Sequence, residues 1–449
     1  MHELWQQGQE PRHVVAIIGG AVSGSEAART LADQGIACVV IEQNTRPYGK
    51  IEDGLPRWHV KLRDAEYGRI NENLARPNVL YVPKTKLGDS LTLETLLHDW
   101  GVDAVLLASG AWRDRPLGIA GIDQYINLGL VYQNPFVYWF NHYNDPGYAG
   151  PRYEVSDDAI VVGGGLASID VVKIINFELF AQALRKRGID VDAETMEHQG
   201  IPSVLQAHGL SQDALGIKGC TLYYRRRKTD MPLASAPDNA TEEQLKKTGV
   251  ARERIMNKVM DKYLVRFEEC QTPVGAIVEA DRLVGLRFAK TEITQGKVVV
   301  VPGSEHEVRA DLIVSSVGSI PEPLAGIPTR GELFQWRNGE TGELEGIENV
   351  FGLGNVLTGK GNIKASRQNA KQISQGVMAR FLGATENASI EQALDLGHAQ
   401  VRQQAEQVAD KVQSKRPRSA EELKRIADGV QSRWQAVGYP GNYPDWIAK

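Results

Sequence analysis

The sequence predicts an α/β fold that contains two βαβ units, and three observations support it. Short apolar runs occur at 14–18 and 159–163, and a glycine-rich turn follows each of them at once. Each turn leads into a stretch with the pattern of a helix. Further apolar runs of strand length follow both units and alternate with helical patterns. Such alternation is typical of parallel sheets covered by helices.

The first turn is built to hold an anion. Gly19 and Gly24 permit a tight turn, and the N–H groups at the start of the next helix face whatever occupies it. Ala21 stands where such turns usually carry a second glycine. A second apolar run ends at Glu42, and an acid there accepts hydrogen bonds from a ribose diol and repels a 2′-phosphate. The first unit is therefore expected to bind a dinucleotide without that phosphate, such as FAD.

The second turn follows the pattern G-x-G-x-x-S, with Gly163, Gly165 and Ser168 at its defined positions. Serine fits the last position because that residue determines how closely the helix packs on the strand. One such pattern is a weak signal, but two of them, each between an expected strand and an expected helix, are a strong one.

Basic residues follow the next strand of the second unit, at 221–224, where the first unit has its acid. Arg225 and Arg226 open this cluster, and guanidinium groups bind phosphate bidentately. The cluster favours the 2′-phosphate of NADP, and a solvated basic turn is the alternative.

The other elements are expected in chain order. They are a loop over 43–59, a helix over 62–74, a strand at 79–82, a helix over 90–100, a strand over 103–110, a loop-containing helical insertion after 174, a helix over 241–263, a small antiparallel sheet over 276–301, strands over 311–318 and 346–355, and a helix over 364–381. From 387 the chain is charged and helical, with capping-box spacing at 389–392 and 419–422 and a break at Pro417. This tail could pack back on the core, mediate dimerisation or dock a partner, and packing back is the simplest case.

The composition is that of an ordinary soluble globular protein of 449 residues, with 42% hydrophobic and 24% charged residues. The net charge of −5 provides no general attraction to nucleic acid or to an anionic membrane. No apolar run approaches the roughly 18 residues of a membrane span, and the first residues lack the pattern of a signal peptide. A cytoplasmic location is therefore expected.

The cysteines exclude several kinds of redox and metal site. Cys38, Cys220 and Cys270 are scattered and form no Cys-x-x-Cys pair, which argues against a redox disulfide, an iron–sulfur cluster and a structural zinc site. No metal is expected, and electron chemistry would have to come from a bound organic cofactor.

Over roughly residues 13–382 the chain resembles the adrenodoxin-reductase-like ferredoxin–NADP(H) reductases, which are related to the glutamate synthase small subunit. Besides the two turns, Glu42 and the basic cluster, the resemblance rests on short motifs that occur in the family's order. These are Pro47–Gly49, Ala108–Gly110, Pro135–Phe140, Ser315–Gly318 and Gly352–Gly354.

The resemblance implies a set of site residues. For FAD it assigns Gly19, Ala21, Gly24, Glu42, Gly49, Gly110, Gly354, Asn355, Gly361 and Ile363, and for NADP it assigns Gly163, Gly165, Ser168, Arg225 and Arg226. It also implies a catalytic pair, His59 and Asp170, that serves proton or electron delivery near the flavin. A histidine that makes only a structural hydrogen bond at the domain junction is the alternative for His59.

The family's organisation implies two nested Rossmann-like dinucleotide-binding domains, an FAD domain with an inserted NADP domain. The expected boundaries are 1–116 and 325–384 for the two parts of the FAD domain, 117–324 for the NADP domain with a junction at 117–157, and 385–449 for the helical extension.

The expected activity is hydride transfer from NADPH to flavin N5, followed by electron transfer to ferredoxin or a similar iron–sulfur protein, or the reverse. Two alternatives stay open. The protein could be the electron-input subunit of a larger complex or a direct reductase of a small molecule, with the tail as a contact for a partner or a second copy. It could instead be a flavin-holding sensor of NADP(H) that does not turn over.

Overall fold

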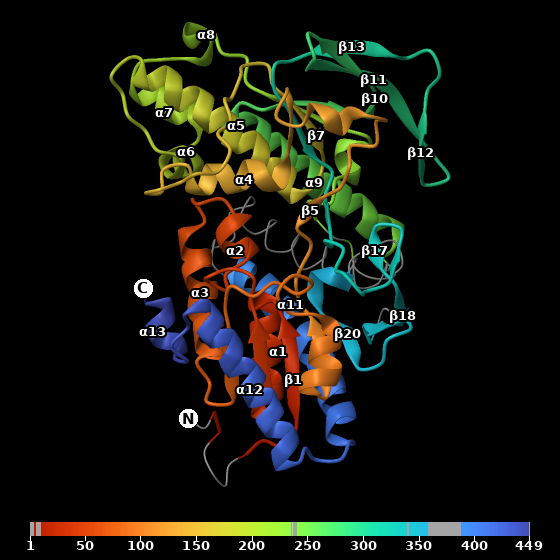
Figure 1. Cartoon of the computed structure of the whole chain (residues 1–449). Coiled ribbons are helices and arrows are strands. Elements are labelled where there is room, and N and C mark those ends of the chain that lie inside the picture. Colours follow the sequence, from red (N-terminus) through yellow and green to blue (C-terminus); the bar gives the residue numbers. More distant parts are fainter. Residues whose placement is uncertain are drawn as a thin grey trace.

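The computed structural model describes residues 4–5, 10–234, 236, 240–338, 341–357 and 388–448, leaving aside the side chains of 388–397. Two sheets form the centres of two lobes (Figure 1). The lower one contains, in order across the sheet, β18 (Trp336–Asn338), β19 (Glu343–Leu344), β20 (Val350–Gly352), β4 (Ala104–Leu107), β1 (Val14–Ile18), β2 (Ala37–Ile41) and β3 (Val79–Val82). The upper one contains β6 (Leu130–Tyr132), β14 (Ile313–Ser316), β7 (Ile160–Gly163), β8 (Thr221–Tyr224) and β9 (Arg266–Glu269), all parallel.

Both faces of the lower sheet are buried. Along β1, Val15 and Ile17 enter one apolar cluster, while Val14 and Ala16 enter another on the opposite face, because side chains alternate along a strand. The helices that cover the first face are α1 (Val22–Asp33), α3 (Val60–Leu74) and α11 (Ala388–Gln413), and those on the second are η1 (Thr95–Trp100) and α12 (Ala420–Val437).

The upper sheet lies between a layer of helices and a smaller antiparallel sheet. The helices are α4 (Gln133–His142), α5 (Leu166–Arg185), α6 (Ala193–Gln199), α7 (Ile201–Ala207), α8 (Gln212–Leu215) and α9 (Glu242–Tyr263), and the small sheet contains β10 (Gln271–Glu279), β11 (Arg282–Thr294), β12 (Lys297–Val300) and β13 (His306–Arg309). Leu286 and Phe288 of β11 pack with Ile160 of β7, which joins the two sheets into one core.

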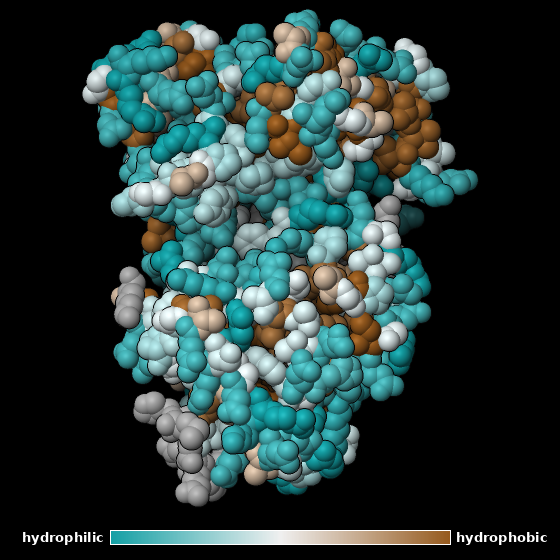
Figure 2. Space-filling model, viewed as in Figure 1, coloured by the Kyte–Doolittle hydropathy of each residue, from teal (hydrophilic) through white to brown (hydrophobic). Residues whose placement is uncertain are grey.

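A two-stranded connector and several side chains join the lobes. The connector pairs β5 (Arg113–Asp114) with β15 (Ser319–Ile320) in antiparallel fashion. Trp58 belongs to a segment of the lower lobe, yet its ring packs in the core of the upper lobe. The waist between the lobes carries mainly hydrophilic residues (Figure 2). The remaining elements are α2 (Lys50–Asp53), η2 (Ile122–Tyr125), η3 (Lys228–Asp230), β16 (Thr329–Arg330), β17 (Leu333–Phe334), η4 (Gly354–Leu357) and α13 (Tyr443–Ile447).

The structure confirms most of the expected elements and corrects two. The expected loop over 43–59 contains the short helix α2, which begins after Gly49 at a positive φ of 49°. The helix expected over 90–100 is reduced to η1, because residues 88–91 form a tight turn in which the Gly88 N–H donates to the Leu91 carbonyl. The loop-containing helical insertion expected after 174 is present: α5 continues to Arg185, and α6, α7 and α8 follow with short loops before β8. The expected helix over 364–381 lies outside the described residues.

The C-terminal tail packs back on the lower lobe. Pro417 separates α11 from α12, and Ser419 and Glu422 form the expected capping box. The corresponding spacing at 389–392 falls where side chains are not described. The tail therefore completes the helical layers on both faces of the lower sheet.

A buried charge cluster fastens α11 to the lower lobe. His398 of α11 lies between two carboxylates, with Nδ1 3.4 Å from Glu26 Oε2 and Nε2 3.4 Å from Glu66 Oε2. Arg402 Nε lies 2.7 Å from Glu26 Oε1. Burial raises the pKa of Glu26, but hydrogen bonds from His398, Arg29 and Arg402 outweigh burial and hold this pKa well below its usual range. Burial lowers the pKa of His398, and the two carboxylates overcome this and raise it.

The cluster predicts how stability depends on pH. The contribution of Glu26 is present above its unfolded pKa of about 4.3 and is lost as pH falls towards the lower folded value. The contribution of His398 is present below its unfolded pKa of about 6.5 and is lost as pH rises through the raised folded value. The free energy of unfolding in urea should therefore be highest near pH 5–6 and decrease on both sides.

Variants test the same cluster. Glu26→Gln leaves a buried imidazolium short of one counter-charge, and we expect it to lower the free energy of unfolding by about 3 kcal/mol. Glu406→Gln, on an exposed position of the same helix α11, should change it by less than about 0.5 kcal/mol. Equal effects of the two variants on the urea midpoint would show that the cluster does not hold the tail.

Candidate functional site

The backbone of the first glycine turn leaves no room for a side chain at Gly19 or Gly24. Gly19 has φ of 98°, and a Cβ there would lie 2.7 Å from the Ala108 carbonyl oxygen of the neighbouring strand end. At Gly24 a Cβ would lie only 1.8 Å from the Gly19 oxygen, so the first turn of α1 packs directly on the loop. The N-terminus of α1 is thereby held against the turn with its N–H groups exposed to an anion.

Glu42 lies at the end of β2 and is buried. Its Oε2 accepts the Gly20 N–H at 2.9 Å and its Oε1 accepts the Asn44 N–H at 2.9 Å. Burial raises the pKa of this carboxyl, while the backbone donors act in the opposite direction. Glu42 thus fastens the glycine turn to the end of β2 and also lines the pocket described below.

Ala21, which departs from the usual second glycine, has a structural counterpart in Gly49. A Cβ on Gly49 would lie 2.9 Å from the Ala21 Cβ, so the two positions share the space of one methyl group. The methyl group of Ala21 therefore occupies space that a side chain at position 49 would otherwise need. Both residues line the same pocket.

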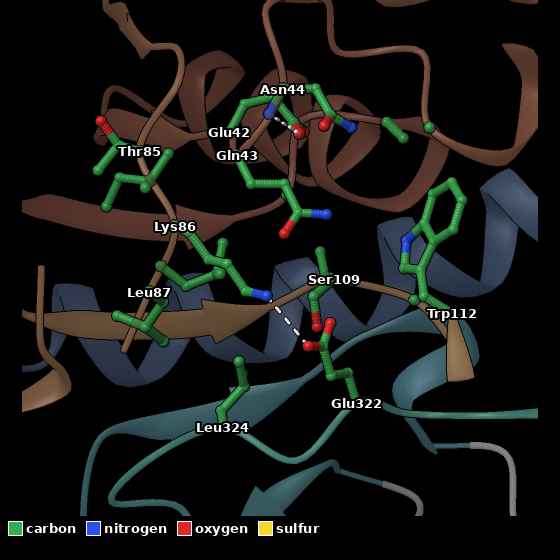
Figure 3. A pocket seen from close by; sticks show the side chains of 17 residues that line it. Glu42, Gln43, Asn44, Thr85, Lys86, Leu87, Ser109, Trp112, Glu322 and Leu324 are labelled. Atoms are coloured by element: carbon green, nitrogen blue, oxygen red, sulfur yellow. Dashed lines mark hydrogen bonds and ion pairs between the residues drawn. The ribbon is translucent and has the colours of Figure 1, made fainter. Parts of the chain in front are cut away.

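A pocket opens over the first turn, and five of the expected residues line it: Gly19, Ala21, Glu42, Gly49 and Gly110. Lys86 and Glu322 pair across it with Nζ and Oε1 3.0 Å apart (Figure 3). Several other lining residues are not among those expected from the sequence, namely Gln43, Asn44, Thr85, Lys86, Leu87, Ser109, Trp112, Glu322 and Leu324.

Part of this set has a signal in the sequence. Thr85 and Lys86 follow the carboxyl end of a parallel strand, which is the edge of an open sheet where ligands bind. Glu322 and Leu324 arrive from the far side of the connector and have no local pattern that reveals their place.

Gly354 lies against the same turn from the end of the lower sheet. Its φ is 63°, and a Cβ there would lie 2.2 Å from the Ser23 Oγ of α1. Asn355 follows it in η4 and is exposed. Gly361 and Ile363 lie outside the described residues, so their assignment stays a prediction.

The second glycine turn connects β7 with α5. Gly165 caps α5 in extended conformation, and a Cβ there would meet no atom within 4 Å, which leaves the helix N-terminus approachable. A Cβ on Gly163 would lie 2.3 Å from the Ser168 Oγ, and this hydroxyl donates to the Ser316 carbonyl at 3.0 Å. Ser168 is fully buried and ties α5 to β14, which is the packing role expected for this position.

The basic cluster lies at the end of β8, at the same edge of the upper sheet as the second turn. The exposed guanidinium of Arg225 makes no hydrogen bond or ion pair with the described part of the chain. The Arg226 guanidinium donates to the Gly296 carbonyl at 3.0 Å. Arg227, in contrast, is bound to the Asp230 carboxylate by two hydrogen bonds. Arg225 and Arg226 are therefore the better placed of the three to take a phosphate.

His59 and Asp170 meet between the lobes. His59 Nε2 lies 3.8 Å from Asp170 Oδ1, and the ring is almost completely buried. The Trp58 Nε1–H donates to the same His59 Nε2 at 3.1 Å. A ring nitrogen that accepts a hydrogen bond carries no proton, so this arrangement corresponds to a neutral His59 protonated on Nδ1.

In the described ranges no cluster of three or more His, Cys, Asp or Glu side chains has the geometry to hold a metal ion. No helix in the same ranges has the length and apolar character to span a membrane.

Several curated proteins of similar sequence carry NADPH in their names, whereas a dihydropyrimidine dehydrogenase subunit of Escherichia coli, 32% identical over 21% of this chain, is named as NAD-dependent. A mitochondrial NADPH:adrenodoxin oxidoreductase of Arabidopsis thaliana is 24% identical over 352 residues, which cover 71% of this chain and 70% of that protein. The beta subunit of a Geobacter sulfurreducens NADPH-Fe(3+) oxidoreductase is 25% identical over 70% of this chain, which spans only 38% of that subunit. A glutamate synthase [NADPH] small chain of Mycobacterium tuberculosis is 24% identical over 73% of this chain and 58% of its own length. No protein-family model matches the chain.

Solved structures confirm the fold class. FprA of Mycobacterium tuberculosis, in a structure described as a complex with NADPH, superimposes with a TM-score of 0.62 at 19% identity. The match covers 95% of this chain and 91% of FprA. The expected α/β arrangement with two dinucleotide-binding units is therefore confirmed, while the roles of individual site residues and the domain boundaries stay predictions.

Proposed function

From the premise that this chain is a homologue of the adrenodoxin-reductase-like NADPH oxidoreductases and of glutamate synthase small chains, we propose that it binds FAD and oxidises NADPH. FAD supplies the electron chemistry, since it accepts two electrons as hydride and can release them one at a time. The proposed physiological acceptor is ferredoxin or a similar small iron–sulfur protein.

The observation that carries the proposal is the contact between His59 and Asp170. Asp170 lies in the first turn of α5, directly beyond the second glycine turn, and His59 follows the segment that lines the first pocket. The contact thus connects the chain just beyond the first pocket with the start of α5 behind the second turn, and such an arrangement suits transfer between ligands of the two turns.

The residues present fit the two cofactors. The open N–H groups at the start of α1 and Lys86 offer positive partners for the pyrophosphate of FAD, and Glu42 offers carboxylate oxygens to its ribose. On the other side, the N-terminus of α5 suits the pyrophosphate of NADPH, and Arg225 with Arg226 suits its 2′-phosphate. The chain supplies orientation and electrostatics, and His59 can hold a proton on Nδ1 at the junction.

The test of the cofactor and the acceptor uses the purified protein. We expect the flavin released from the protein to be identified as FAD by chromatography. We also expect NADPH-dependent turnover to be saturable with ferredoxin and faster with ferredoxin than with quinones or ferricyanide. Protein that neither retains nor rebinds a flavin would refute the proposal.

An alternative function is that of an electron-input subunit. The Geobacter relative is named as a beta subunit, and exposed valines gather over the β10–β12 part of the upper lobe (Figure 2). These are Val274, Val278, Val299 and Val300. Recovery of a stable native complex, with ferredoxin turnover no better than that of small acceptors, would favour this alternative.

Glu42 provides a prediction about cofactor retention. Glu42→Gln removes one of the acceptors for the turn and the negative charge for the ribose, so we expect the Kd for FAD to rise about 10- to 100-fold. Glu72→Gln, an exposed position on α3, is the matched control and should leave the Kd unchanged. Fluorescence titration of the flavin-free protein measures both. Unchanged affinity in the Glu42 variant would place this carboxylate outside the binding site.

A further inference from the structure

We propose that Lys173 is a positioning residue for the His59–Asp170 pair: its ammonium group holds the Asp170 carboxylate and sets the pH at which His59 takes up a proton. The inference rests on the proposed function only for its consequence in turnover. The contacts that carry it are independent of any cofactor.

Lys173 lies one helical turn beyond Asp170 on α5, so that both side chains leave the helix on the same side. Its Nζ is 3.7 Å from Asp170 Oδ1, the same oxygen that lies 3.8 Å from His59 Nε2. On its other side, Nζ lies 2.9 Å from Glu197 Oε2 of α6. One carboxylate oxygen is thus placed between an ammonium and an imidazole, and the ammonium is placed between two carboxylates.

The surroundings keep the lysine charged although its side chain has no exposed surface. Nζ lies 4.9 Å from the ring centroids of both Trp58 and Tyr263, in positions where a cation is attracted to the ring face. Two aromatic rings and two carboxylates therefore replace the water that a buried ammonium has lost.

Trp58 links this cage to His59. The face of its indole ring attracts Lys173, and its Nε1–H donates to His59 Nε2. A proton on Nε2 would end this hydrogen bond and turn His59 towards the Asp170 carboxylate at 3.8 Å. The tryptophan therefore favours neutral His59, and Asp170 favours the charged form.

The balance of charge decides between the two forms. Among the described residues, Asp170 of α5 lies next to His59, and Lys173 behind it is in turn next to Glu197 of α6 and the Tyr263 ring of α9. On the segment of His59 itself, the Arg57 guanidinium is directed away, over the Phe140 ring and 4.0 Å from Glu178. In this described group, the Lys173 ammonium offsets part of the negative charge of the Asp170 and Glu197 carboxylates.

Loss of Lys173 removes one positive charge from beside the Asp170 carboxylate, and this change favours a protonated His59. We therefore expect Lys173→Met to raise the midpoint of His59 titration by about one pH unit or more. Lys173→Arg keeps the charge and should leave the midpoint within about 0.3 of the wild-type value. Glu197→Gln removes a negative charge, keeps the lysine and should lower the midpoint.

The measurement is NMR titration of the holoenzyme labelled at histidine Cε1, with the His59 signal assigned from its loss in His59→Gln. The pH profile of kcat with NADPH should show the same displacement in Lys173→Met and its reversal in Lys173→Arg. Lys246→Met, on the exposed side of α9, controls for the removal of a lysine elsewhere.

An unchanged His59 midpoint in folded Lys173→Met overturns the inference. If that variant does not fold, Glu197→Gln decides it, because a midpoint that does not move downwards also overturns it. A displaced midpoint in protein whose flavin NADPH cannot reduce would count against the proposed function alone, so the two failures are distinguishable.

Discussion

Gly24→Ala is expected to abolish dinucleotide binding at the first turn and to lower the free energy of unfolding by about 3 kcal/mol. The added Cβ would lie 1.8 Å from the carbonyl oxygen and 2.9 Å from the carbonyl carbon of Gly19. Both atoms belong to the backbone of the turn, so no side-chain rotation can relieve the contact. Either α1 must shift away from the sheet or the turn must open, and each change removes the N–H groups from their anion.

The matched control is Gly68→Ala on an exposed position of α3. A Cβ there meets no atom within 4 Å, and alanine in a helix interior should leave stability unchanged or raise it by up to about 1 kcal/mol. Urea unfolding and flavin content of the purified variants measure the difference. A Gly24→Ala variant that retains flavin and unfolds at the same urea concentration as the wild type would show that this turn is not the dinucleotide-binding site.

Arg225→Ala combined with Arg226→Ala should raise the KM for NADPH about 100-fold and change the KM for NADH by less than about threefold. Both residues follow the end of β8, and an arginine–phosphate contact there can exist only with the phosphorylated cofactor. NADH has no 2′-phosphate, so its binding does not depend on these guanidinium groups.

Arg227→Ala is the matched control, because the Arg227 guanidinium is already bound to the Asp230 carboxylate. It removes a charge from the same cluster, and we expect only a small change in KM for either cofactor. If the double substitution raised the KM for NADPH and the KM for NADH equally, the 2′-phosphate would have to bind elsewhere.

The elements with a strong local pattern could be predicted from the sequence. Each glycine turn follows an apolar strand and precedes a helix, and the structure shows both, with Gly19 and Gly24 required by contacts shorter than a Cβ permits. The capping box at Ser419 was likewise predictable, since it depends on residues three positions apart. Such features need only neighbouring residues, and neighbouring residues are what a sequence shows directly.

Features that depend on distant segments could not be predicted. Trp58 leaves the lower lobe and packs in the core of the upper one, and Glu322 reaches the pocket from beyond the connector to pair with Lys86. Ala21 stands where such turns usually carry a glycine, and the absence of a side chain at the distant Gly49 leaves the space that its methyl group occupies. The place of each of these residues is decided by packing between segments that no periodicity connects.

The most direct test of the account is anaerobic titration of the flavin-loaded protein with NADPH, followed through the visible absorbance of the flavin. The account predicts that the flavin bleaches with about one NADPH per chain, and that NADH reduces it far more slowly. Flavin that stays oxidised with excess NADPH would contradict it, and would favour a protein that holds its cofactor without transferring electrons.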